Sequence, residues 1–285
     1  MAAAIRADMF ALPQPFYLRG EKMAKICPLF SGSRGNSYYI SAAGSGILID
    51  AGRSAKQLEN ALAANSIDID TIRAIFVTHE HSDHIQGLRV FSTRHKIKVY
   101  ASHETLNALE QMGAVNEKVD SREIDSRGIA VDSMLIKPFA TSHDCAGSVG
   151  YTVEMSDGTK IALATDTGII TEEISKAITG CNAVIIESNH DVGMLMNGAY
   201  PYQLKRRILS DCGHLSNDTC SRLLPQLVES GATRFILAHL SRDNNMPMIA
   251  ESAALYELGQ SGMKRNKDFT LMVAPPETCG ESVIL

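Results

Sequence analysis

Four side chains that can bind a metal ion fall within the six residues from His79 to His84, in the pattern His-x-His-x-Asp-His. Imidazole suits Zn, Fe and similar ions, and the carboxylate of Asp83 extends the choice toward Mn. A turn after a strand can aim His79 and His81 to one side and Asp83 and His84 to another. The run therefore predicts half of a two-metal site, and the alternative is a solvated polar turn.

Further potential ligands occur where strands are expected to end. His143 lies in Thr-Ser-His-Asp, Asp166 in Ala-Thr-Asp-Thr-Gly and His239 in Leu-Ala-His-Leu-Ser. We expect Asp166 to bridge two metals. A hydroxide held between two cations forms near neutral pH and is a nucleophile. The predicted shells are His79, His81 and His143 for one divalent ion (Zn, Mn or Fe), and Asp83, His84 and His239 for the other.

The elements expected to position these residues alternate between strands and helices. The apolar run 74–78 is a strand that delivers the histidine motif at its C-terminal end, where α/β folds place ligands. Asp50, Asp166, Glu187 and His239 lie at or just beyond the ends of other expected strands. The other strands are expected at 25–30, 37–41, 46–50, 97–100, 130–138, 149–155, 160–164, 183–187, 234–238 and 269–274, and the helices at 55–65, 105–112, 171–179, 201–209, 217–229 and 248–260.

The amino-acid composition indicates the class of protein to which the chain belongs. Apolar residues make up 45% and charged residues 21% of the 285 residues, as in ordinary globular proteins, and we expect one domain over residues 23–285. Residues 1–22 resemble no secretory signal and are expected to be a poorly ordered extension, or to follow from a translation start placed too early.

Charge, hydropathy and cysteine content narrow the possibilities further. The net charge of -5 argues against an extensive basic surface for nucleic acid, although a local basic groove is compatible with it. No apolar stretch is long enough to span a membrane. The six cysteines are dispersed and form no CxxC pair, which indicates reduced thiols in a cytoplasmic protein.

Seven segments together resemble the metallo-β-lactamase superfamily, and within it the YycJ/WalJ-type branch of nucleases. The similarity extends from about residue 25 to residue 285. It implies an α/β fold, a four-layer αββα sandwich with the metals at the edge between its two sheets, and 5′-to-3′ exonuclease activity on DNA. The segments are 30–37 (FSGSRGNS), 48–52 (LIDAG), 78–84 (THEHSDH), 164–168 (ATDTG), 187–191 (ESNHD), 213–217 (GHLSN) and 237–241 (LAHLS).

The expected catalytic residues are Asp83, His214 and Glu187. In the related tRNA 3′-processing nucleases, a His in a similar Gly-His stretch protonates the leaving oxygen, and the resemblance implies that role for His214. The alternative is that His214 caps the helix beginning near residue 216 or 217. Glu187 is expected to orient His214, as acidic partners commonly orient imidazoles. Asp50 is expected to be structural.

The candidate substrate contacts are Ser33, Asn36, His190, Asn217 and Arg242. Ser33 and Asn36 lie in a turn whose backbone N–H groups could approach a phosphate, although a plain β-turn explains them as well. A surface position is the alternative for His190. The basic run 205–207 could also meet phosphates, but such a run is more often a solvated helix face.

Spacing separates the nuclease classes that the resemblance raises. Only 22 residues lie between His143 and Asp166, too few for the arm that grips tRNA, and 72 lie between Asp166 and His239, too few for a large β-CASP cap. We therefore expect an open site. The leading hypothesis is a two-metal phosphodiesterase that degrades DNA with a metal-bridging hydroxide. The alternatives are a small-molecule hydrolase acting on a cyclic phosphodiester, thioester or lactone, a tRNA 3′-processing endonuclease, and a binding protein without turnover.

Overall fold

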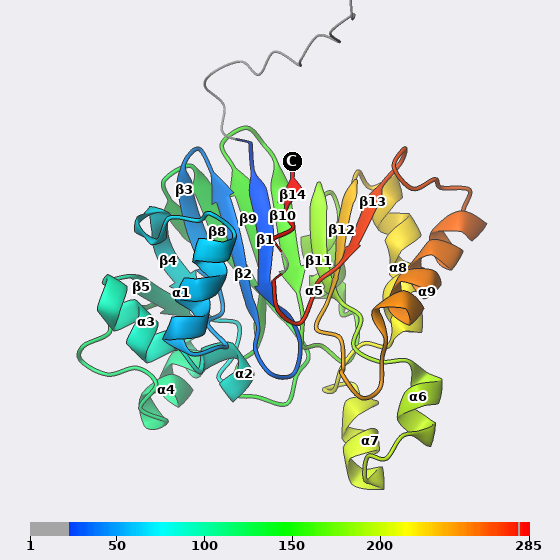
Figure 1. Cartoon of the computed structure of the whole chain (residues 1–285), viewed down its shortest axis with the longest axis horizontal. Coiled ribbons are helices and arrows are strands. Elements are labelled where there is room, and N and C mark those ends of the chain that lie inside the picture. Colours follow the sequence, from blue (N-terminus) through cyan, green and yellow to red (C-terminus); the bar gives the residue numbers. More distant parts are fainter. Residues whose placement is uncertain (1–22, 279) are drawn as a thin grey trace, which may run out of the picture.

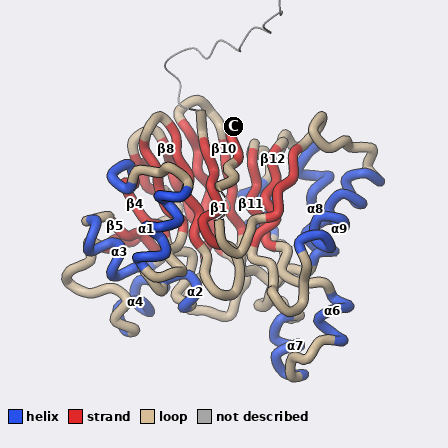
Figure 2. Tube along the Cα trace, in the orientation of Figure 1, coloured by secondary structure: helices blue, strands red, loops and turns tan. Residues whose placement is uncertain are grey.

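The computed structural model describes residues 23–278 and 280–285. The extension predicted at residues 1–22 lies outside this range. The described residues form two seven-stranded sheets that pack face to face, with helices on the outer faces (Figures 1 and 2). This is the four-layer αββα sandwich in a single domain that the sequence predicted.

The first sheet is antiparallel at one edge and parallel at the other. Its strand order is β14-β1-β2-β3-β4-β5-β6. β3 to β6 run parallel, so the motif after β4 lies at the carboxyl edge of this parallel part. The strands are β1 (Lys25–Phe30), β2 (Ser37–Ala42), β3 (Ser45–Ile49), β4 (Ile72–Phe76), β5 (Lys98–Ala101), β6 (Ser121–Glu123) and β14 (Val283–Ile284).

The second sheet has the order β13-β12-β11-β10-β9-β8-β7, with β10 to β13 parallel. The prediction of a single strand at 130–138 is wrong. The chain turns back at Asp132, whose φ of 49° is left-handed, and forms a hairpin. The strands are β7 (Ile129–Val131), β8 (Met134–Ala140), β9 (Val149–Met155), β10 (Lys160–Ala164), β11 (Ala183–Glu187), β12 (Arg234–Ala238) and β13 (Thr270–Val273).

Helices cover both outer faces and extend one end of the sandwich. In Figure 1, α6 and α7 project beyond the strand ends, and α2 lies near the same end. The helices over the first sheet are α1 (Ala55–Ala64), α3 (Leu88–His95) and α4 (His103–Gln111); those over the second are α5 (Glu172–Ile178), α8 (Asn217–Glu229) and α9 (Pro247–Gln260). The short elements are η1 (Ile69–Thr71), α2 (Ser82–Ile85), α6 (Val192–Asn197) and α7 (Tyr202–Ile208). Among the described residues, no helix is both long enough and apolar enough to cross a bilayer.

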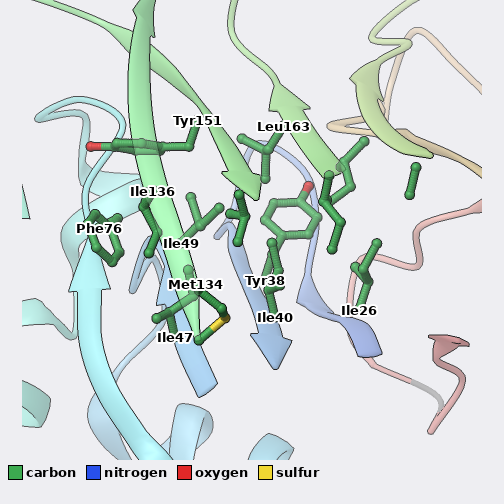
Figure 3. Packing of buried hydrophobic residues seen from close by; sticks show 14 of the residues in the cluster. Ile26, Tyr38, Ile40, Ile47, Ile49, Phe76, Met134, Ile136, Tyr151 and Leu163 are labelled. Atoms are coloured by element: carbon green, nitrogen blue, oxygen red, sulfur yellow. The ribbon is translucent and has the colours of Figure 1, made fainter. Parts of the chain in front are cut away.

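Apolar side chains on both faces of the central strands build three layers of core. Ile47 and Ile49 of β3 point between the sheets, whereas Leu48 packs under the helices of the first sheet. Strands buried on both faces read as continuous apolar runs, which is why their positions are evident in the sequence. Figure 3 shows Ile49, Phe76 and Tyr151 in the layer between the sheets.

Three polar residues follow strands in the left-handed backbone region. Asp50, Asp166 and His239 have φ values of 64°, 57° and 55°. Holding a residue other than glycine in this region costs on the order of 1–3 kcal/mol, and such residues cluster at functional sites. The sandwich therefore holds these three side chains at one edge in conformations that the surrounding contacts must stabilise.

Phe76 offers a test of the core that supports the motif. It is fully buried, stacks on Tyr100 at 5.2 Å between ring centroids, and meets Tyr151 edge-on at 5.6 Å. Phe76→Ala should lower the free energy of unfolding by about 3–5 kcal/mol in chemical denaturation, because a buried ring is replaced by a cavity. The control Val90→Ala, at a side chain that is 46% exposed, should change it by less than about 0.5 kcal/mol. Equal losses in the two variants would contradict this description of the core.

Candidate metal centre

One buried carboxylate, Asp50, holds both ends of the histidine motif. The amide and hydroxyl of Thr78 donate to Asp50 Oδ1 at 2.8 Å and to Oδ2 at 2.9 Å. His84 Nδ1 lies 2.7 Å from the same Oδ2 atom. Because Thr78 and His84 already occupy both carboxylate oxygens of this buried residue, these contacts support the predicted structural role of Asp50.

Hydrogen bonds on one ring nitrogen orient the other imidazoles. His79 Nδ1 lies 3.0 Å from Thr78 Oγ1, and His143 Nδ1 lies 3.1 Å from a main-chain carbonyl oxygen. His239 Nδ1 lies 2.9 Å from Glu187 Oε1. An acceptor on one nitrogen fixes the tautomer and leaves the other nitrogen with a lone pair for a metal. In all three rings that other nitrogen is Nε2.

Two groups of potential metal ligands converge at the edge between the sheets. Asp166 lies between them, with Oδ2 at 3.4 Å from His84 Nε2 and Oδ1 at 4.0 Å from His143 Nε2. The structure thus brings together the seven residues that the sequence assigned to two metals. One group is His79, His81 and His143, the other is Asp83, His84 and His239, and the ligand atoms within each group lie within 4.8 Å of one another.

Three buried atoms that lack hydrogen-bond partners indicate that this centre can accommodate cations. His79 Nε2, His239 Nε2 and Asp166 Oδ2 are buried and have no hydrogen-bond partner within the described part of the chain. Leaving a buried polar atom without a partner costs about 1–3 kcal/mol. Each of the three atoms offers a lone pair, so bound cations would satisfy all of them. Imidazoles together with carboxylates match the ligand preferences of Zn, Mn and Fe.

The pKa values of the buried histidines also indicate that the centre suits cations. Burial alone would lower the pKa of His84, but the carboxylates of Asp166, Asp50 and Asp83 raise it to about 9. Burial and the neighbouring imidazoles keep the pKa of His79 well below its ordinary value, so this ring is neutral, as a metal ligand must be. The centre is a negative pocket that stabilises added positive charge.

Glu187 connects a predicted ligand to the predicted acid. Its Oε1 atom lies 2.9 Å from His239 Nδ1 and 2.7 Å from His214 Nδ1. The carboxylate is fully buried, whereas the His214 side chain is 14% exposed and lines the cavity of the centre. His214 does not cap α8, because Ser216 is the N-cap and its hydroxyl accepts a hydrogen bond from the amide three residues on, at 3.1 Å. The capping alternative is therefore wrong.

Asn36 is a correction to the predicted substrate contacts. It is fully buried, and its amide Nδ2 lies 3.0 Å from His84 Nε2 and 3.2 Å from Asp83 Oδ2. Its main-chain N–H donates to the carbonyl oxygen of Asp83 at 2.7 Å. Asn36 therefore positions two potential ligands and has no free surface for a substrate.

Asn217 and His190 are also buried. The Asn217 side chain accepts a hydrogen bond from Ser188 at 2.7 Å and donates to Asn245 at 2.9 Å, so it is committed to a network of buried amides. His190 is 1% exposed and does not line the cavity of the centre, and burial lowers its pKa to about 4. Neither residue is placed to contact a substrate, and the surface alternative for His190 is wrong as well.

The cavity of the centre, about 230 Å³, has a wall that the spacing of the ligands did not indicate. Tyr200 and, on α7, Leu204 and Arg207 line it. Arg207 forms an ion pair with Asp144, with Nη2 at 2.7 Å from Oδ1. Lys205 Nζ instead donates to two main-chain carbonyl oxygens. Of the predicted substrate contacts, Ser33 lines this cavity, and Arg242 lines a neighbouring one.

Comparison with known proteins agrees with this geometry. Residues 46–240 match the family model described as "Beta-lactamase superfamily domain". The chain is 37% identical to "Exodeoxyribonuclease YycJ" of Bacillus anthracis over 251 residues, which covers 87% of this chain and 94% of the relative. It is 34% identical to "Exodeoxyribonuclease WalJ" of Streptococcus pneumoniae strain D39 over 258 residues, or 89% of this chain and 95% of the relative.

Solved structures share the fold. The metallo-β-lactamase fold protein YhfI from Bacillus subtilis superposes with a TM-score of 0.68 at 14% identity, over 92% of this chain and 99% of that one. The short form of human tRNase Z gives a TM-score of 0.56 at 16% identity, over 76% and 93%. The family match over residues 46–240 and the relatives at 34% and 37% identity show that the chain belongs to the metallo-β-lactamase superfamily of hydrolases.

Proposed function

We propose that the protein is a two-metal phosphodiesterase that degrades DNA as a 5′-to-3′ exonuclease. The observation that carries this proposal is the contact of Glu187 with both His239 and His214, at 2.9 and 2.7 Å, which supports a role for His214 as a proton donor beside a potential metal ligand. The relatives named exodeoxyribonucleases, aligned over most of their length, support a nuclease role.

Seven side chains of this chain would bind the two metal ions. His79, His81 and His143 would hold one ion, Asp83, His84 and His239 the other, and Asp166 would contact both. When bound, two such ions supply a deprotonated water and polarise the scissile phosphate. Arg207 lines the same cavity, where its guanidinium is paired with the carboxylate of Asp144.

His214 would protonate the leaving oxygen. Glu187 accepts from its Nδ1 atom, so the ring presents its Nε2 side to the cavity that it lines. A nucleoside alkoxide is a poor leaving group, and protonation by a positioned acid typically accelerates its departure by about 10²–10⁴. Glu187 is a positioning residue in this scheme, because it acts through His214 and His239.

The activity is tested with single- and double-stranded DNA and RNA labelled at either end, in the presence of Mn, Zn or Mg. We expect a 5′ label on DNA to be released at once in a short product, while a 3′ label stays on steadily shorter fragments. Chelation should stop both. Hydrolysis of a thioester or a lactone without cleavage of any nucleic acid would contradict the proposal, and so would release of the 3′ label first.

Two substrates with different leaving groups test the role of His214. His214→Ala should slow cleavage of DNA by about 10²–10⁴, yet slow hydrolysis of bis-p-nitrophenyl phosphate far less, because p-nitrophenolate leaves without a proton. His103→Ala is the matched control, since that side chain is 64% exposed and lies outside the centre. Equal losses on the two substrates would show that His214 is not the acid.

Metal content tests the assignment of the ligands. The wild-type protein should bind two divalent ions per chain, and at a free metal concentration 100 times Kd each bound ion should raise the free energy of unfolding by about 2.7 kcal/mol. Asp166→Ala should lose bound metal and most of this rise, because its carboxylate contacts both groups. Elemental analysis and thermal unfolding measure the two quantities. An unchanged metal content in Asp166→Ala would rule out its bridging role.

A further inference from the structure

A second cavity of about 230 Å³ lies next to the centre, and Ser33 lines both. We call it the arginine cavity, because three of its lining side chains are guanidinium groups. The turn at residues 31–35 forms one side, and Pro276 and Glu277 form the other. The arginines are Arg34, Arg53 and Arg242, which are far apart in the sequence.

The three arginines are not neutralised by the protein. Within the described residues, none of them has a carboxylate oxygen within 4.0 Å, in contrast to Arg207, which is paired with Asp144. Arg34 and Arg242 are exposed. Glu277 is the one carboxylate among the lining residues of the described chain, so the wall carries two more positive than negative charges. In a chain with a net charge of -5, this local excess is distinctive.

Arg53 is held in a fixed position. Its guanidinium carbon lies 5.4 Å from the centre of the Phe30 ring, and Nη1 donates to the carbonyl oxygen of Arg34 at 3.2 Å. Its stem crosses Gly35, where a Cβ atom would come within 2.2 Å of Arg53 Cδ. Arg53 Nε is buried and has no partner in the described part of the chain. Arg53 lines the cavity, and a pre-positioned guanidinium suits binding of an oxyanion.

The turn at residues 31–35 adds main-chain donors and is fixed to the metal centre. The amides of Ser33 and Arg34 make no hydrogen bond within the described chain, and both residues are exposed. Ser31 Oγ accepts a hydrogen bond from the amide of His239 at 2.8 Å. Successive free amides in a turn form a concavity that favours anions. The hydrogen bond of Ser31 therefore joins this turn to the main chain of a potential metal ligand.

We propose that the arginine cavity binds a second phosphate of the nucleic-acid strand whose scissile phosphate lies at the metal centre. This inference rests on the proposed function. Guanidinium groups bind phosphate oxygens in pairs of parallel hydrogen bonds, and Ser33 connects the two cavities along the path of such a strand. The phosphate is either the terminal monoester, in which case the cavity sets the distance from the strand end to the cut, or an internal diester, in which case it sets the direction of the strand.

The experiment compares kcat and KM for four oligonucleotides: one with a 5′-phosphate, one with a 5′-hydroxyl, and each of these with a neutral methylphosphonate linkage beside the cleaved position. In the wild-type protein, removal of the bound phosphate should raise KM about tenfold with little change in kcat. A dependence on the 5′ group identifies the terminal phosphate, and a dependence on the linkage identifies an internal one.

The variants Arg34→Gln and Arg242→Gln should raise KM for the best substrate to the value for the substrate that lacks the bound phosphate, and should abolish the difference between the two. Glu277→Gln should act in the opposite direction and lower KM, because it removes the negative charge from the wall. The control Arg222→Gln removes the same charge from an exposed position on α8 and should leave KM unchanged.

The outcomes separate the two proposals. If the wild-type protein cleaves DNA but Arg34→Gln and Arg242→Gln behave like Arg222→Gln, the arginine cavity is not a phosphate subsite and the nuclease function stands. The same holds if neither phosphate affects KM. If the wild-type protein cleaves no nucleic acid while it still hydrolyses bis-p-nitrophenyl phosphate, the proposed function fails, and the inference drawn from it fails as well.

Discussion

The site depends on the confinement of imidazoles and carboxylates in a small buried space. Asp166, His79 and His84 all have less than 3% of their surface exposed, and their ligand atoms lie within 4.8 Å of one another. Buried charges and lone pairs at this density are costly unless cations or protons balance them. The fold supplies the confinement at the edge of the sandwich, and the negative pocket that results makes the site able to bind metal ions.

Around this centre, buried polar residues hydrogen-bond to several of the potential metal ligands. Asp50 fixes Thr78 and His84, Glu187 fixes His239, and Asn36 lies against Asp83 and His84. Such contacts set tautomers and ring orientations, and without them the ligand atoms would not converge. Glu187 has a second use, because the same oxygen also contacts His214. One buried carboxylate thereby couples the position of a potential metal ligand to that of the proposed acid.

The sequence predicted best what is local. β11 at Ala183–Glu187 has the predicted bounds, because a strand buried on both faces is a nearly continuous apolar run. β9 at Val149–Met155 also has the predicted bounds, and in its second half apolar residues alternate with Thr152 and Glu154. The hairpin of β7 and β8 was missed because its turn at Asp132 and Ser133 lies within an otherwise strand-like segment. The helix α3 is not evident in the sequence, because most of its residues are polar and only a few apolar ones, such as Leu88 and Phe91, are buried.

Within the site, the ligand residue types were evident from the sequence, but their neighbours were not. Asn36 and Asn217 are polar residues in motifs next to the ligands, and only the packing shows that their amides are buried. Arg34, Arg53 and Arg242 come together through the meeting of three loops, which no spacing in the sequence indicates.

Anomalous diffraction from crystals grown with Mn²⁺ would show whether each of the two ligand groups holds a divalent ion. We expect two anomalous peaks, one among His79, His81 and His143 and one among Asp83, His84 and His239, with Asp166 beside both. Peaks elsewhere, or an Mn-free centre in which these side chains keep their positions, would contradict it.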